Sequence, residues 1–67
     1  MSVFAGFDLG GTQLKYGLID DAGTLLFKDK APTPPTIREL MGLIETLWQN
    51  LKRGESRKIR AVGFGFP

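Results

Sequence analysis

The sequence contains neither cysteine nor histidine in its 67 residues. Disulfide bonds, thiol nucleophiles and the usual structural zinc sites are therefore excluded within this segment. An imidazole cannot serve as a general base there either. The sequence also lacks an apolar run near the ~20 residues that span a membrane, and its first residues lack the pattern of a signal peptide. We therefore expect a soluble, cytoplasmic protein with no membrane partner.

The sequence has little net charge and little length. The formal net charge is +2, with 42% hydrophobic and 24% charged residues, which is typical of a folded domain. A domain this short buries only ~60% of its unfolded surface, so it is marginally stable by itself. The sequence also stops at Pro67, directly after a predicted strand. We interpret residues 1–67 as the amino-terminal part of a larger domain.

One stretch of the chain is rich in basic side chains. Its members are Lys52, Arg53, Arg57, Lys58 and Arg60. Such a group could form a nucleic-acid patch. The run is interrupted by residues 54–56, which favours a solvated loop, and we expect no nucleic-acid partner.

The first half of the chain predicts a three-stranded antiparallel meander. The apolar run at 3–9 indicates a buried strand, and the alternation over 13–18 indicates a second one. Residues 20–23 have turn chemistry, with aspartates to begin the turn and Gly23 where a positive φ is required. Residues 24–28 then predict a third strand.

A stiff connector and an amphipathic helix follow the meander. The prolines within 31–35 exclude a helix or a central strand there. Thr36 and Glu39 form a capping-box pattern that begins a helix, and Gly54 suits the C′ position at its end. The apolar positions with helical spacing, predicted to face the core, are Ile37, Leu40, Met41, Ile44, Leu47, Trp48 and Leu51.

Residues 57–66 resume an extended pattern and predict a fourth strand. Simple alternation places Val62 and Phe64 on one face and Ile59 on the other. A helical crossover between strands of one sheet most often makes them parallel. The expected order is β-β-β-α-β, an α/β arrangement.

The glycine pair at the first turn is the candidate functional motif. Phosphate groups need donors without steric bulk, which the backbone amides of Gly10 and Gly11 could supply, and Thr12 adds a hydroxyl. A carboxylate beside phosphates, here Asp8, suits a Mg²⁺ ion that lies between them. Lys15 could reach the same cleft from the next strand. The alternative, a plain hairpin turn, stays open at this point, because the motif is neither a Walker A loop nor a dinucleotide fingerprint.

Two stretches of the sequence resemble a known family. Residues 7–20, Phe-Asp-Leu-Gly-Gly-Thr-Gln-Leu-Lys-Tyr-Gly-Leu-Ile-Asp, resemble the first phosphate motif of the ROK family. Residues 61–67, Ala-Val-Gly-Phe-Gly-Phe-Pro, resemble that family's strand before a Pro-Gly turn. The family holds bacterial glucokinases, related hexose and N-acetylhexosamine kinases, and sugar-responsive repressors. The resemblance implies part of a ribonuclease H-like fold, the actin-like ATPase fold shared by actin, heat-shock 70 proteins and hexokinases.

The resemblance also implies cofactors and site residues. ATP and Mg²⁺ would be the cofactors, with Asp8 orienting Mg²⁺ through water. The family often has a basic residue at the position of Gln13, so this sequence departs from the pattern there. Gly65 and Pro67 would lead into the sugar-binding loop. The residues that would contact the β- and γ-phosphates of ATP are Gly10, Gly11, Thr12 and Lys15.

Other parts of the family's machinery would lie beyond residue 67. They are the catalytic base, the sugar-contacting residues, the zinc motif and the second domain, and the family is usually oligomeric. No catalytic residue is therefore expected in this segment, which we predict to be inactive alone. The partners implied for the whole protein are a small-molecule sugar and further copies of itself.

The implied function is ATP-dependent phosphorylation of a hexose or an N-acetylhexosamine. One alternative is a sugar-responsive transcriptional regulator of the same family. Its helix-turn-helix domain would precede the phosphate motif, and the seven residues before Asp8 leave no room for one. Another alternative is a non-kinase ATPase of the superfamily, which the match at residues 63–67 disfavours.

Overall fold

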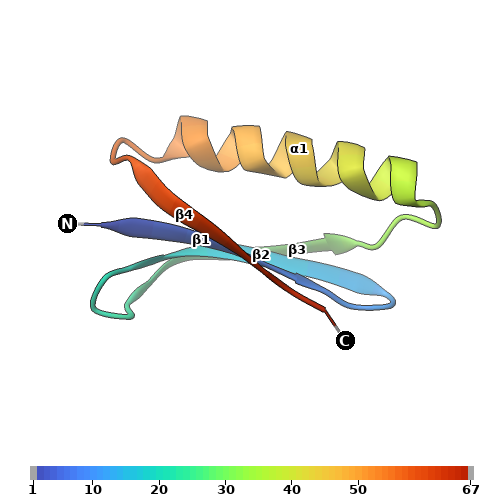
Figure 1. Ribbon diagram of the computed structural model, residues 1–67, viewed down its shortest axis with the longest axis horizontal. Coiled ribbons are helices and arrows are strands. Elements are labelled where there is room, and N and C mark those ends of the chain that lie inside the picture. The colour runs from blue at the N-terminus through green and yellow to red at the C-terminus, as the bar shows by residue number, and fades with distance from the viewer. Residues whose placement is uncertain (1, 67) are drawn as a thin grey trace.

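The protein forms a four-stranded mixed sheet with one helix packed on one face (Figure 1). The computed structural model describes residues 2–66. Its elements are β1 (Val3–Leu9), β2 (Gln13–Asp20), β3 (Leu25–Pro32), α1 (Ile37–Gly54) and β4 (Ile59–Gly65). The predicted β-β-β-α-β order is confirmed.

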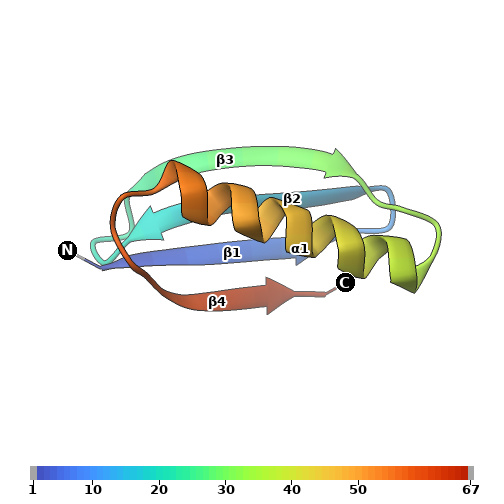
Figure 2. The ribbon, with the colours of Figure 1, turned by 90° about the horizontal axis from the view of Figure 1, so that it is seen from above.

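The strands lie in the order β3-β2-β1-β4. β1 pairs antiparallel with β2, and β2 pairs antiparallel with β3, so the first half of the chain is the predicted meander. α1 then carries the chain across the sheet to the free side of β1, where β4 pairs parallel with it (Figure 2). The predicted parallel crossover is therefore confirmed.

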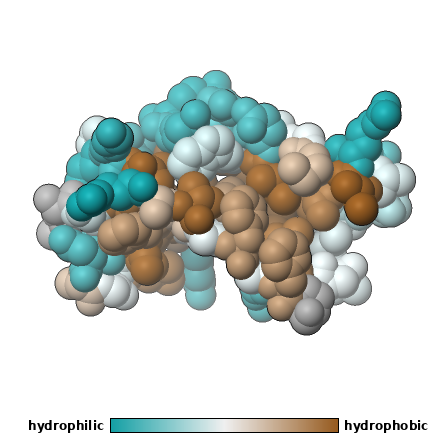
Figure 3. Space-filling view, viewed as in Figure 1, coloured by the Kyte–Doolittle hydropathy of each residue, from teal (hydrophilic) through white to brown (hydrophobic). Residues whose placement is uncertain are grey.

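The hydrophobic core lies between α1 and the sheet. Strand alternation sends every second side chain toward the helix, and hydrophobic atoms gather there while the outer side of α1 is hydrophilic (Figure 3). Among residues 2–66, no helix combines the length and apolar character that crossing a membrane requires. The buried core residues are Val3, Ala5, Phe7, Leu14, Leu18, Leu47 and Leu51.

The helix begins where the sequence predicts. Thr36 is the N-cap, and its side-chain oxygen accepts a hydrogen bond from the Glu39 amide at 3.2 Å. The predicted apolar stripe is wrong at two positions, since Ile37 is 78% and Met41 60% exposed. The first turn of α1 extends past the end of β4 (Figure 2). Leu43, outside the predicted stripe, packs against the core instead.

The end of the helix also differs from the expectation. Gly54 is the last helical residue and not a left-handed C′ residue, and the extended Glu55 caps the helix. Gly23, with φ of 84°, is the glycine that needs positive φ among the described residues. This matches the prediction for the β2–β3 turn.

Two strands depart from simple pattern rules. β3 runs on to Pro32, beyond the predicted end at Lys28, because a proline is tolerated in a strand that lies at the edge of the described sheet. In β4 the register with β1 shifts, so that Ile59 pairs with Val3 but Ala61 pairs with Phe4. Arg60 is therefore the extra residue of a bulge. Ile59 consequently packs against the core, as Val62 does, and its predicted position on the opposite face is wrong.

Asp20 organises the β2–β3 turn. One oxygen of its carboxylate accepts from the amides of Ala22 and Thr24, each at 2.9 Å. Its predicted role in the turn is confirmed. Its side chain is only 6% exposed. Burial is tolerable because the carboxylate is satisfied by backbone donors.

Candidate functional site

The glycine loop, residues 10–12, joins β1 to β2. The Gly10 amide donates to the Gln13 carbonyl at 3.0 Å, which closes the turn. A Cβ atom at Gly10 would lie 2.8 Å from that same carbonyl oxygen, so a side chain does not fit. At Gly11 a Cβ would meet nothing within 4 Å. The two glycines therefore differ. The turn excludes a side chain at Gly10, whereas the space around Gly11 is free of other described protein atoms.

The loop presents backbone donors to solvent. Gly11 and Thr12 are both exposed. Within residues 2–66, their amides donate to no protein acceptor. Exposed amides in a glycine turn can donate hydrogen bonds to a phosphate oxygen. The loop is therefore chemically suited to an anionic ligand.

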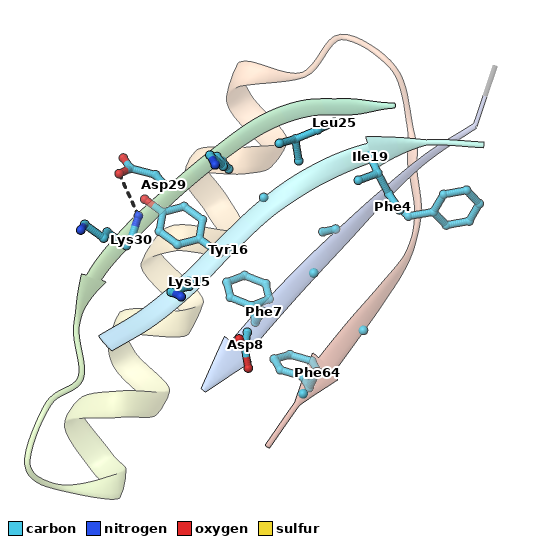
Figure 4. A pocket seen from close by; sticks show the side chains of 16 residues that line it. Phe4, Phe7, Asp8, Lys15, Tyr16, Ile19, Leu25, Asp29, Lys30 and Phe64 are labelled. Carbon is cyan, nitrogen blue, oxygen red and sulfur yellow. Dashed lines mark hydrogen bonds between the residues drawn. The ribbon is translucent and has the colours of Figure 1, made fainter. Parts of the chain in front are cut away.

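Asp8 and Lys15 lie side by side next to the loop. They are register partners on β1 and β2, and they lie on the sheet face that α1 does not cover (Figure 4). Both side chains are exposed, and they form no ion pair with each other or with another described residue. On the other side of Asp8 lies Gly65 of β4, where a Cβ atom would come within 3.5 Å of the carboxylate. The absence of a side chain at Gly65 keeps the Asp8 carboxylate accessible.

A shallow hollow of about 900 Å³ covers this open face of the sheet. Asp8, Lys15 and Gly65 line one end of it, and Phe4 and Ile19 contribute apolar surface. The loop residues 10–12 are not part of its lining. The structure thus brings Asp8 and Lys15 into one concave surface and places the loop amides beyond its end.

The residues present fit a magnesium ion only in a limited sense. Residues 2–66 contain no group of three or more His, Cys, Asp or Glu side chains that could hold a metal ion. Asp8 is a single accessible carboxylate. Mg²⁺ usually takes one or two carboxylates and keeps several waters or phosphate oxygens. Asp8 therefore suits such an ion as one ligand among several, most of them not from this segment.

The ionisable groups with shifted pKa values lie outside the loop. Burial and the neighbouring Asp29 carboxylate raise the pKa of the Tyr16 phenol. The hydrogen bonds from Arg57 lower the pKa of the Glu55 carboxyl, and the two side chains pair at 2.9 Å. The Glu55–Arg57 pair lies between α1 and β4 in the chain, so it stabilises the connection rather than the candidate site.

One residue at the loop was missed by the sequence reasoning. Thr33 donates its amide to the Thr12 carbonyl at 3.0 Å and its hydroxyl to the Gly10 carbonyl at 2.9 Å. The available signal was a single threonine among prolines, where few other backbone donors exist. Of the residues expected to lead into a sugar-binding loop, Gly65 lies beside Asp8, and Pro67 lies outside the described residues.

Comparison with known proteins gives this geometry a context. No protein-family model matches the chain. Two curated glucokinases, from Streptomyces coelicolor and Streptomyces lividans, are each 34% identical over 65 residues, which is 97% of this chain. A crystal structure of a ROK family glucokinase from Streptomyces griseus, in complex with glucose and AMPPNP, superposes with a TM-score of 0.81 and 30% identity over 96% of the chain. The chain is therefore similar to one segment of ROK family glucokinases.

The ROK-like segment has a partial actin-like ATPase fold, as the resemblance implied. Its mixed sheet and its helix correspond to part of the larger Streptomyces griseus structure. The segment spans about a fifth of the length of these relatives, 20% in each case. The remaining parts of such a protein are therefore not represented in residues 1–67.

Proposed function

We propose that residues 8–15 bind the phosphates of ATP in a kinase that phosphorylates a hexose or an N-acetylhexosamine. The glucokinase relatives, and a structural neighbour that holds glucose and AMPPNP, support this proposal. We also propose that residues 1–67 belong to the first, phosphate-binding domain of that kinase. The sugar and the catalytic base would be held by parts of the protein outside this segment.

One observation carries the proposal. The loop between β1 and β2 exposes the amides of Gly11 and Thr12 beside the accessible carboxylate of Asp8. A plain hairpin needs no carboxylate at that point, and an uncompensated carboxylate beside an anion would repel it. The combination is favourable when a nucleotide phosphate and a cation bind together.

The chemistry is transfer of the γ-phosphoryl group. The bond from the γ-phosphorus to the β–γ bridging oxygen breaks, a new bond forms to a sugar hydroxyl oxygen, and the hydroxyl proton passes to a base. Catalysis of this kind depends on positioning and on neutralising phosphate charge. The loop amides and Thr12 would hold the β- and γ-phosphates, Lys15 would add positive charge, and Asp8 would hold Mg²⁺, which neutralises the charge on the phosphates.

The test uses the full-length protein that carries this segment. Sugar-dependent release of ADP is measured with glucose, N-acetylglucosamine and N-acetylmannosamine. Replacing Asp8 by Asn keeps the size of the side chain but removes its charge, and we expect the kcat to fall by roughly a hundredfold or more. Asp21→Asn is the matched control, because Asp21 is an exposed aspartate in the β2–β3 turn.

Either of two outcomes contradicts the proposal. One is a full-length protein that binds no nucleotide and phosphorylates none of the sugars. The other is an Asp8→Asn variant that is as active as the Asp21→Asn control. In the second case the protein would still be a kinase, but Asp8 would not contribute to its phosphate site.

A further inference from the structure

The connector between β3 and α1 contains an unusual donor. Residues 32–35, the end of β3 and the start of the connector, have the sequence Pro-Thr-Pro-Pro. Proline has no backbone N–H, so Thr33 supplies the only backbone donor of these four residues. Thr33 is also half-buried, although the connector lies at the surface.

Both donors of Thr33 are used on the glycine loop. Its amide donates to the Thr12 carbonyl at 3.0 Å, and its hydroxyl donates to the Gly10 carbonyl at 2.9 Å. The hydroxyl contact joins residues 23 positions apart in the sequence. One residue therefore holds both ends of the loop from the side of β3.

These contacts orient two peptide planes of the loop. In a planar trans peptide, the carbonyl and the following N–H point in opposite directions, and the described chain has no cis peptide bond. Because the Gly10 and Thr12 carbonyls are directed at Thr33, the amides of Gly11 and Gln13 are directed away from it. Of the two exposed amides proposed to bind phosphate, that of Gly11 is thus turned to the side opposite Thr33.

The position of Thr33 is itself restricted. A residue that precedes proline is confined to extended conformations, and Pro34 follows Thr33 directly. The preceding Pro32 is held in β3 by its pairing with Gln13. The loop carbonyls are therefore held by a residue with little conformational freedom of its own, which reduces the entropy cost of ordering the loop around a ligand.

We propose that Thr33 is a positioning residue of the phosphate-binding loop, acting through the Gly10 and Thr12 carbonyls to hold the loop and to orient the Gly11 amide toward the phosphates of ATP. The proposal rests on the proposed function of that loop. Thr33 does not touch the nucleotide in this arrangement. Loss of the Thr33 hydroxyl should therefore weaken ATP binding without changing the binding of the sugar.

The experiment compares two variants in the full-length protein. Thr33→Val keeps the shape of the side chain and the amide but removes the hydroxyl, whereas Thr33→Ser keeps the hydroxyl. We expect Thr33→Val to raise the KM for ATP roughly tenfold, the value of one hydrogen bond, with the KM for glucose unchanged. We expect the KM for ATP of Thr33→Ser to stay within about twofold of that of the parent protein.

Thr46→Val is the matched control. The Thr46 hydroxyl also donates to a backbone carbonyl, that of Gly42, at 3.0 Å, but on the exposed side of α1. It should leave both KM values unchanged. If Thr33→Val matches this control while Asp8→Asn is impaired, the positioning role is refuted and the phosphate site stands.

Other outcomes are equally decisive. If Thr33→Val raises the KM values for ATP and glucose alike, Thr33 has a general structural role and the proposal fails. If Thr33→Val does not fold, the Ser variant decides, because a tenfold rise in its KM for ATP would also overturn the proposal. If Asp8→Asn and Thr33→Val both behave as the parent protein, the proposed function and this inference fail together.

Discussion

At the scale of single residues, substitutions at the two loop glycines distinguish a role in the stability of the turn from a role in binding ATP. Gly10→Ala would place a methyl group 2.8 Å from the Gln13 carbonyl oxygen, a backbone atom that already accepts the Gly10 amide. We expect a loss of roughly 1–3 kcal/mol in the free energy of unfolding, because the turn must open. Thermal unfolding of the full-length protein without nucleotide measures this change.

Gly11→Ala is the companion variant. Its Cβ would meet nothing within 4 Å in the described chain, so we expect the unfolding temperature to stay near that of the parent protein. If the phosphates approach this backbone closely, the KM for ATP should still rise several-fold. A variant that lost stability as Gly10→Ala does would contradict this account of the loop.

Also at the residue scale, Tyr16 gives a dependence on pH. Burial and the Asp29 carboxylate raise its pKa, so the folded phenol stays protonated where an unfolded one, with a pKa of 10.0, has begun to ionise. The unfolded state then binds fewer protons, and this contribution to stability falls as the pH rises above the unfolded pKa. Subtracting the ultraviolet titration of Tyr16→Phe from that of the parent protein should give a phenol midpoint above 10.0.

A midpoint at or below the ordinary value would contradict this environment for Tyr16. Urea unfolding of the same pair provides a second check. The parent protein should lose stability relative to Tyr16→Phe only on the alkaline side of the unfolded phenol pKa, about 10.

At the scale of elements, the apolar side chains of α1 should differ in how much they contribute to the stability of the fold. Leu47 is 8% exposed within the core cluster, whereas Met41 is 60% exposed. We expect Leu47→Ala to lower the free energy of unfolding, measured by denaturant titration, by about 2–4 kcal/mol, because transfer energy is lost and a cavity remains. Met41→Ala should cost less than about 1 kcal/mol in the same denaturant titration. Equal losses would show that the helix face is not oriented as described.

Element boundaries show where local sequence rules are sufficient. The start of α1 was predictable because the Thr36 cap and the Glu39 amide are three residues apart, so the signal is wholly local. The end of β3 was not, because whether Pro32 can stay in a strand depends on its lying at the sheet edge. The bulge at Arg60 depends on the partner strand β1, which is distant in sequence.

At the scale of the whole molecule, large apolar side chains are exposed among the described residues. Phe64 and Phe66 are 49% and 73% exposed, and the sheet face opposite α1 is uncovered. Exposed groups of this kind mark surfaces that other parts of a protein cover. The observation agrees with the segment's share of its relatives, 20% of their length.

The proposed place of this segment in a larger kinase leads to a prediction about activity. Residues 1–67 alone should release no ADP from ATP in the presence of glucose, because the proposed site lacks a catalytic base and a sugar-binding surface. A coupled ADP assay on the isolated segment, with the full-length protein as a positive control, measures this. Glucose-dependent turnover that Asp8→Asn abolishes in the isolated segment would contradict the prediction.

The sequence by itself determined the order of the elements, the meander, the helix start and the candidate loop with Asp8 and Lys15. These follow from spacings of a few residues, over which chain geometry permits few alternatives. Only the tertiary structure decided that Met41 is exposed, that Ile59 faces the core and that Thr33 holds the loop. Each of these depends on contacts between residues far apart in the sequence, and local periodicity carries no information about them.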